Sequence, residues 1–161
     1  MENRLQFLLR KNAGKRYLET YKDILSKLIV DGSYNIIGLE ETDVISEKII
    51  KNQITLQDNN LIWTDKHIPF VEKSKLKRII SGIQSRNNDI VYMSIKNSDL
   101  CGLVVLNRID SFNVNFQYRD EPSGLIVFYD RSLINKLIVD FYEEDNEYFY
   151  DLEIQGREWR L

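Results

Sequence analysis

Hydrophobic residues recur every three to four positions between residues 16 and 30, the spacing that lines one face of a helix. Gly32 follows this segment, and glycine readily adopts the left-handed conformation that ends a helix. The pattern therefore predicts a helix over residues 16–30. Leucines within residues 5–9 indicate a shorter helix that either joins this one or breaks at Gly14. The predicted inner face comprises Tyr17, Leu18, Tyr21, Ile24, Leu25, Leu28 and Ile29.

Three further segments show helical spacing. One helix is predicted over residues 43–51 with Thr42 or Asp43 as its cap, a second follows Pro69, and a third begins at Asp130. Each has an apolar side that would face a core. These inner faces are Val44, Ile45, Ile49 and Ile50, then Leu76, Ile79, Ile80 and Ile83, and finally Leu133, Ile134, Leu137, Ile138 and Phe141.

Alternating apolar and polar residues, or short apolar runs between turn residues, predict the strands. Residues 54–56 and 61–63 flank the polar residues 57–60, which indicates a hairpin. Residues 36–39 form either a short strand or an apolar loop. Further strands are predicted over residues 90–95, 100–107, 113–118, 125–129 and 148–154.

This order of elements predicts an α+β fold. N-terminal helices are followed by an antiparallel sheet of about five or six strands, with one helix inserted before the last strand. The chain of 161 residues is 43% hydrophobic and can bury a sizeable core. With 2 Pro and 7 Gly and no linker-like stretch, residues 1–161 are expected to form one domain.

Composition also bounds the location of the protein. The single Cys101 excludes an intramolecular disulfide, the apolar runs are too short to cross a bilayer, and the N-terminal residues lack the pattern of a signal peptide. We therefore expect a cytoplasmic protein with no membrane contact.

Charge is divided unequally along the chain. Residues 1–86 contain 15 Lys/Arg and 11 Asp/Glu, whereas residues 87–161 contain 7 and 14, so the halves carry +4 and −7. Most of the negative excess lies near the C-terminus, where acids alternate with aromatic residues. Carboxylates steer a basic protein into contact and rigid rings hold it, so this segment is a candidate binding surface. The candidate residues are Tyr142, Glu143, Glu144, Asp145, Glu147, Phe149, Asp151 and Glu153.

Two features of this segment allow different interpretations. Consecutive acids at residues 143–145, placed near a predicted helix C-terminus, repel one another and the helix dipole, and a cationic partner would relieve that cost. The competing interpretation is a solvated acidic turn with Tyr148 and Tyr150 in the core.

Catalytic and cofactor motifs are absent from the sequence. There is no phosphate-binding loop, no calcium loop, no second histidine for zinc and no Cys–His signature, so neither a metal nor a cofactor is expected. A small hydrolase that uses His67 and carboxylates is one alternative. A nucleic-acid-binding regulator is another, and its basic residues would be Lys73, Lys75, Lys77 and Arg78. The sequence pI of 5.3 makes nucleic acid the less favoured partner.

In its size and its acidic, aromatic C-terminal segment from Asp140 to Asp151, the chain resembles the immunity proteins of bacterial toxin–immunity pairs, including contact-dependent growth inhibition systems. This resemblance implies that the protein binds and occludes a cognate, nuclease-like toxin domain with a basic surface. Because such proteins have diverse folds, the resemblance assigns no individual residue.

Overall fold

The computed structural model describes residues 2–55 and 62–160 and confirms the α+β class. Within this part of the chain, seven strands form one antiparallel sheet in the order β1-β4-β3-β5-β6-β7-β2. The strands are β1 Tyr34–Ile36, β2 Ile62–Pro69, β3 Val91–Ser94, β4 Val104–Leu106, β5 Leu125–Asp130, β6 Lys136–Glu144 and β7 Glu147–Gln155. The helices are α1 Arg4–Leu28, α2 Leu39–Thr55, α3 Ser74–Arg86 and α4 Ser98–Cys101, with a 3-10 turn at Ile109–Ser111.

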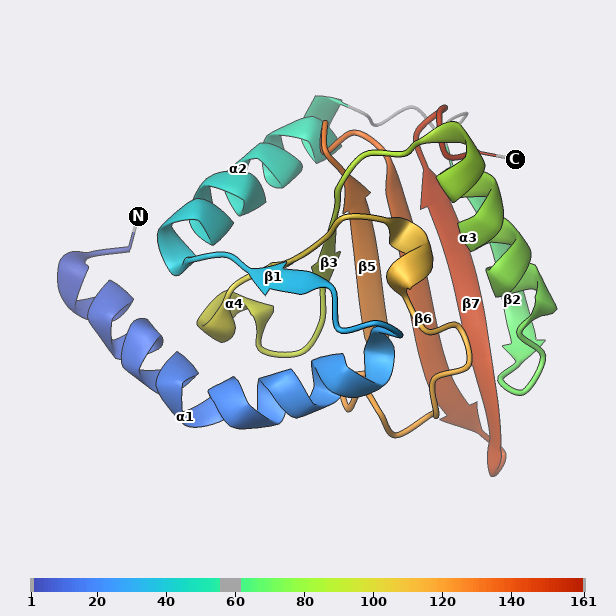
Figure 1. The fold of residues 1–161 in the computed structure, drawn as a ribbon, viewed down its shortest axis with the longest axis horizontal. Coiled ribbons are helices and arrows are strands. Elements are labelled where there is room, and N and C mark those ends of the chain that lie inside the picture. Colours follow the sequence, from blue (N-terminus) through green and yellow to red (C-terminus); the bar gives the residue numbers. More distant parts are fainter. Residues whose placement is uncertain (1, 56–61, 161) are drawn as a thin grey trace.

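Helices cover the two faces of the sheet unequally (Figure 1). α1 and α3 pack on one face, which we call the inner face, where Leu25 and Leu76 join the main core with Met93 and Phe128. α2 lies on the opposite, outer face and packs over the part of the sheet that contains Tyr92 and Tyr129. The outer face of β6, β7 and β2 therefore remains accessible.

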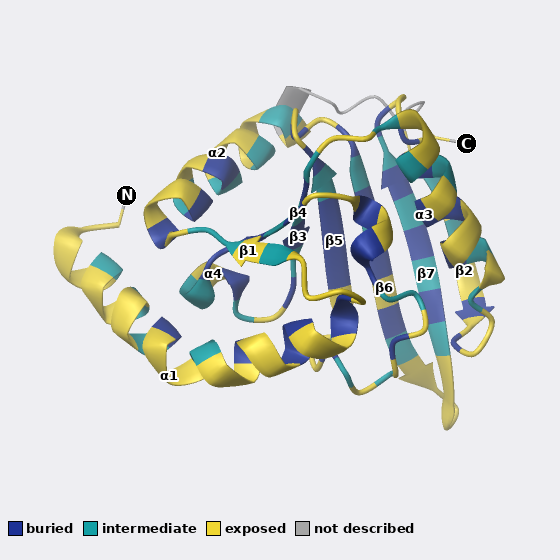
Figure 2. Ribbon diagram, in the orientation of Figure 1, coloured by how far each residue is buried: buried dark blue, intermediate teal, exposed yellow. Residues whose placement is uncertain are grey.

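Burial follows the same arrangement (Figure 2). β5 is dark blue along most of its length, whereas the N-terminal half of α1 and the tip of the β6–β7 hairpin are mainly exposed. The best-covered part of the sheet is thus its centre, and the hairpin tip projects from it.

α1 is continuous from Arg4 to Leu28, so the apolar segment at residues 5–9 joins the helix predicted for residues 16–30. Gly14 lies inside this helix because α4 crosses it closely: a Cβ atom at Gly14 would lie 2.0 Å from the Leu100 carbonyl oxygen. The glycine permits helix contact and does not end the helix.

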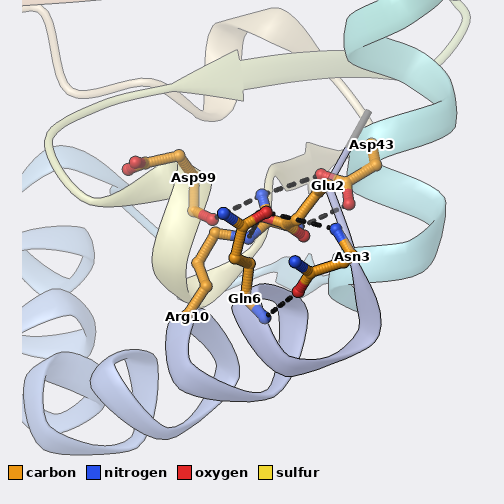
Figure 3. A network of polar contacts seen from close by, with 6 residues as sticks. All are labelled: Glu2, Asn3, Gln6, Arg10, Asp43 and Asp99. Carbon is orange, nitrogen blue, oxygen red and sulfur yellow. Dashed lines mark hydrogen bonds and ion pairs between the residues drawn. The ribbon is translucent and has the colours of Figure 1, made fainter.

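A polar network anchors the first turns of α1 (Figure 3). Asn3 and Gln6 form a reciprocal capping box, which satisfies free amides at the helix start. The Arg10 guanidinium donates to both Asp43 carboxylate oxygens, at 2.9 and 2.5 Å, and to the Asp99 carbonyl at 3.3 Å. The hydrogen bond to Asp43 is the main cause that raises the pKa of Arg10.

Neither proposed cap of the second helix has that role. α2 begins at Leu39 and not at residue 43, so Thr42 and Asp43 lie inside it. Asp43 pairs with Arg10, while the buried Thr42 hydroxyl accepts the Leu103 amide at 3.0 Å. Both polar side chains form tertiary contacts that local sequence does not reveal.

The predicted hairpin over residues 54–63 is wrong in its first strand. Ile54 and Thr55 belong to α2, and residues 56–61 lie outside the described residues. Ile62 begins β2, which pairs with β7 at the opposite end of the sequence. β2 is therefore held by a long-range pairing.

The helix predicted after Asp130 is a strand. β6 runs from Lys136 to Glu144, with Leu137, Val139 and Phe141 buried and the intervening side chains more exposed. Positions 137 and 141 share a face in both a helix and a strand, which is why the apolar pattern was ambiguous. No helix is inserted before the last strand within the described chain.

The strand predicted over residues 113–118 is also wrong. This segment is a series of turns in which Asn113 accepts the Asn115 amide at 3.1 Å and donates to the Lys27 carbonyl at 3.1 Å. Asparagine side chains that bond the backbone in this way compete with a strand. The segment predicted as a strand over residues 100–107 begins in α4, and β4 covers its last part. By contrast, the helix predicted after Pro69 and the strands near residues 90–95, 125–129 and 148–154 are confirmed.

Candidate protein-binding surface

The outer face of the β6–β7 hairpin brings together acids and aromatic rings from both strands. The antiparallel register places Asp140 opposite Asp151, Tyr142 opposite Phe149, and Glu144 opposite Glu147. Because side chains alternate between the two faces of a sheet, these pairs lie on one side and the buried Phe141–Tyr150 pair lies on the other.

β2 extends this surface through a local irregularity. Its register with β7 shifts between Asp65 and Ile68, and His67 in the bulge adopts a left-handed φ of 59°. Bulges reorient a side chain, and here the His67 ring stacks on Phe149 with centroids 3.9 Å apart and planes 16° apart. The ring centroid of Tyr142 lies 6.1 Å from that of Phe149. Strands β2, β6 and β7 therefore each contribute one ring to the cluster.

Asp151 holds this cluster in place. Its Oδ1 accepts hydrogen bonds from the His67 backbone N–H at 2.7 Å and from the Tyr142 hydroxyl at 2.9 Å. Desolvation, and then the bond to Asp151, raises the pKa of Tyr142 to about 12, so this hydroxyl stays a donor at neutral pH. The carboxylate thus fixes both the bulge and the tyrosine.

The position of His67 was not expected from the sequence. Its Nδ1 lies 3.3 Å from the Tyr142 hydroxyl and 3.6 Å from a Glu144 carboxylate oxygen, while 58% of its side chain is exposed. Only the pairing of β2 with β7 brings the imidazole to these carboxylates. No sequence signal marks that pairing.

A shallow acidic hollow adjoins the aromatic cluster. A cavity of about 240 Å³ is lined by Asp140, Asp151 and Glu153, and by Thr64 and Lys66 from β2. Desolvation, followed by the charge of Asp151, raises the pKa of Asp140. Two carboxylates directly opposite each other repel, which destabilises the sheet at this point.

Six of the eight predicted residues share the outer face: Tyr142, Glu144, Glu147, Phe149, Asp151 and Glu153. Glu143 projects from the inner face, where it lies opposite Tyr148, whose ring stacks on Tyr118 at 4.0 Å. Asp145 lies in the turn itself. The sequence identified the segment but not this division.

The acidic run at residues 143–145 ends a strand and not a helix, so no helix dipole acts on these acids and the predicted repulsion from one is wrong. Asp145 and Asn146 have φ angles of 52° and 64°, the geometry of a type I′ two-residue hairpin turn. Alternation across the sheet separates Glu143 from Glu144. Of the acids in this hairpin tip, Glu144 alone has a basic side chain within 4 Å among the described residues, namely His67.

A larger cavity lies elsewhere, at the β5–β6 turn. Its volume is about 760 Å³, and its lining includes Asp130, Asn135, Arg131 and Arg157. The buried Asp130 and Asn135 are fully occupied with each other and with turn amides, for example the Asn135 N–H at 3.1 Å. These polar groups stabilise the turn and are not directed to a ligand.

Contacts within the protein engage part of the basic segment Lys73–Arg78 at the start of α3. The Lys73 ammonium lies 3.8 Å from the Phe70 ring centroid and donates to the Phe116 carbonyl at 3.2 Å, while Lys75 pairs with Asp65 at 2.7 Å. Lys77 and Arg78 remain exposed. Two of the four predicted phosphate-binding cations are therefore committed within the fold.

Residues 2–55 and 62–160 contain no group of three or more His, Cys, Asp or Glu side chains placed to hold a metal ion. None of the described helices combines the length and apolar character that a membrane crossing requires. Cys101 is half-buried, burial raises the pKa of its thiol, and the thiol contacts the Gly14 carbonyl at 3.5 Å. No protein-family model matches the chain, and neither curated proteins nor solved structures show a significant match to it.

Proposed function

We propose that the protein is a binding inhibitor of the immunity type, whose outer sheet face captures and occludes a basic, nuclease-like toxin domain. The observation that carries this proposal is the facing Asp140–Asp151 pair beside the stacked His67 and Phe149 rings. A surface of this kind combines an excess of negative charge with rigid apolar anchors.

Negative charge on the outer face would contribute electrostatic energy to the complex. Asp140 and Asp151 repel each other in the free protein. A lysine or arginine from a partner would attract both carboxylates and so offset this repulsion. Glu153 and Glu144 add negative charge on the same face, against Lys66 and Lys136 from β2 and β6. The surplus favours a cationic partner.

The aromatic cluster would contribute to affinity. Phe149 is half-buried and fixed between His67 and Tyr142, so it loses little conformational freedom when a partner covers it. Rings that are already ordered are typical of binding hot spots. Occlusion would then be steric, because the flat sheet face covers the basic substrate groove of the toxin.

Affinity capture from the native host tests the proposal. The wild-type protein is compared with an Asp140→Asn/Glu153→Gln variant, and with a Glu19→Gln/Glu47→Gln control that removes the same charge from exposed positions on α1 and α2. We expect the wild type and the control to recover a basic nuclease-like domain and to protect cells that express it. Equal recovery by the outer-face variant would contradict the proposal.

Salt provides an independent measurement. Association driven by exposed charge slows as ionic strength rises, because the Debye length falls from about 10 Å at 0.1 M to about 3 Å at 1 M. We expect the association rate constant to fall with added salt and the dissociation rate constant to change little. An association rate constant that does not change with salt concentration would exclude electrostatic steering by this face.

A hydrolase remains the second candidate because the fold gathers His67, Tyr142 and Glu144. His67→Ala separates the two functions. An enzyme would lose turnover, whereas an inhibitor would bind more weakly but still form its complex, because the outer-face carboxylates and Phe149 are still present. Inhibition of the captured domain by the variant would support the binding role.

A further inference from the structure

We propose that the cleft beside the hairpin tip receives an arginine side chain from the basic partner. This inference rests on the proposed function, and it names the group that anchors the complex. The cleft has a volume of about 280 Å³ and lies between the chain that leaves β2 and the first residues of β7. Its lining residues are Pro69, Phe70, Val71, Glu147, Tyr148 and Phe149.

The walls of the cleft are apolar and open to solvent. Val71 is 91% exposed and Tyr148 is 38% exposed, which is unusual for large apolar side chains that border the same hollow. Covering these groups would remove apolar surface from water and favour binding. The cleft therefore suits a ligand with an apolar stem.

The cleft is also rigid. Pro69 is paired with Phe149, and the Phe70 N–H donates to the Tyr148 carbonyl at 2.9 Å. His67 stacks on Phe149, and Tyr118 stacks on Tyr148 with centroids 4.0 Å apart. Because these neighbours hold the two lining rings, little ordering is needed when a side chain enters.

Charge decides which side chain fits. Glu147 lines the cleft and lies opposite Glu144 across the hairpin. No basic side chain of the described chain lies within ion-pair distance of Glu147 or Asp145, whereas Glu144 has only the imidazole of His67. A cation from outside would supply the missing counter-charge.

Arginine matches both requirements. Its three methylene groups pack on apolar surface, and its planar guanidinium stacks on aromatic rings while donating to carboxylates. In this cleft the stem lies along Val71 and Pro69, and the guanidinium donates to the Glu147 carboxylate. Lysine offers a compact point charge and lacks the planar fork of donors that matches a carboxylate, so it binds more weakly.

The probe is N-acetyl-arginine amide, titrated into the isotopically labelled full chain at low salt and followed by NMR. We expect saturable shifts of the backbone amides of Val71, Glu147, Tyr148 and Phe149. N-acetyl-citrulline amide, which has the same shape without the charge, should leave these amides unshifted. Equal shifts with citrulline, or arginine-specific shifts confined to other surfaces, would overturn the inference.

Variants locate the binding. Glu147→Gln and Val71→Ala change exposed residues, and each should lower the affinity for N-acetyl-arginine amide about two- to fivefold. The matched controls are Glu47→Gln and Val44→Ala, on the exposed side of α2, and these should bind as the wild type does. Unchanged affinity in both cleft variants would exclude the cleft.

The two proposals fail separately. If capture of the partner depends on Asp140 and Glu153 but its affinity is unchanged by Glu147→Gln and Val71→Ala, the proposed arginine site is wrong and the proposed inhibitor function stands. If arginine amide binds the cleft but no basic protein is captured, the site stands and the inhibitor is wrong.

Discussion

Asp140 on β6 lies directly opposite Asp151 on β7, with both carboxylates on the outer face of the sheet. The two residues have different roles. Asp151 accepts hydrogen bonds from His67 and Tyr142, whereas no hydrogen bond to the Asp140 side chain is formed from the described residues. Asp140 is therefore the member of the pair that can be changed without disturbing the bulge of β2.

Asp140→Asn should stabilise the free protein and weaken its complex. The raised pKa of Asp140 means that ionisation opposes folding, so the gain grows as pH rises from the unfolded-chain pKa of about 3.9 to the raised pKa, and it is small near pH 3, where the carboxyl is largely protonated in both states. We expect about 0.5 kcal/mol at pH 7, since solvent screens the repulsion. Urea unfolding at both pH values measures it. A loss of stability at pH 7 would contradict the repulsion.

Gly14→Ala should destabilise the protein although alanine favours helices. Helix propensity alone predicts a gain of about 1 kcal/mol, but the new Cβ would lie 2.0 Å from the Leu100 carbonyl oxygen and force α4 away. We expect a net loss of about 2 kcal/mol in the free energy of unfolding. Gly38→Ala is the control, because its Cβ meets no atom within 4 Å. An increase in the free energy of unfolding of Gly14→Ala would show that α4 can move away from α1 at little cost.

Asp130→Ala should unfold the β5–β6 turn. The buried Asp130 carboxylate accepts the Ile134 and Asn135 backbone amides and the Asn135 side-chain amide, and alanine leaves these donors without their acceptor. We expect a loss of about 3 kcal/mol by thermal or urea unfolding. Asp31→Ala removes a similar bond to Ser33 from an exposed loop and should cost under about 1 kcal/mol. Similar losses for both variants would contradict the role of burial.

Lys73 should make stability depend on alkaline pH. Desolvation lowers the pKa of Lys73 to about 8, below the value of about 10.4 in an unfolded chain, so the folded state loses its proton first. Stability of the wild type relative to Lys73→Met should therefore rise between pH 8 and about pH 10. Comparison with the variant cancels the titration of tyrosines. A flat difference would mean that the nearby Phe70 and Phe116 rings hold the ammonium in its charged form.

Prediction from sequence succeeded where the hydrophobic spacing of a segment fits only one type of secondary structure. α3 places Leu76, Ile79 and Ile83 on one face at a spacing that no strand can use. β7 alternates buried Tyr150, Leu152 and Ile154 with more exposed residues. In both elements, local spacing and tertiary burial agree.

Prediction failed where two solutions share the same residues. Leu137 and Phe141 fit a helix face and a strand face equally, and the hydrogen-bonding side chain of Asp130 can cap a helix or a turn. Pairing of β6 with β7 along its whole length, and with β5 over Lys136–Asp140, decided the outcome. That choice depends on partners that lie outside the segment.

By itself, the sequence determined the α+β class, the buried face of α3, most of the buried face of α1, and the acidic, aromatic character of the C-terminal segment, because composition and spacing are properties of neighbouring residues. Tyr17, predicted on the inner face of α1, is exposed. Only the tertiary structure decided that β2 pairs with β7, that His67 stacks on Phe149, and that Asp140 faces Asp151. These contacts join residues far apart along the chain. Long-range strand pairing is set by the packing of the whole sheet, and no local pattern encodes it.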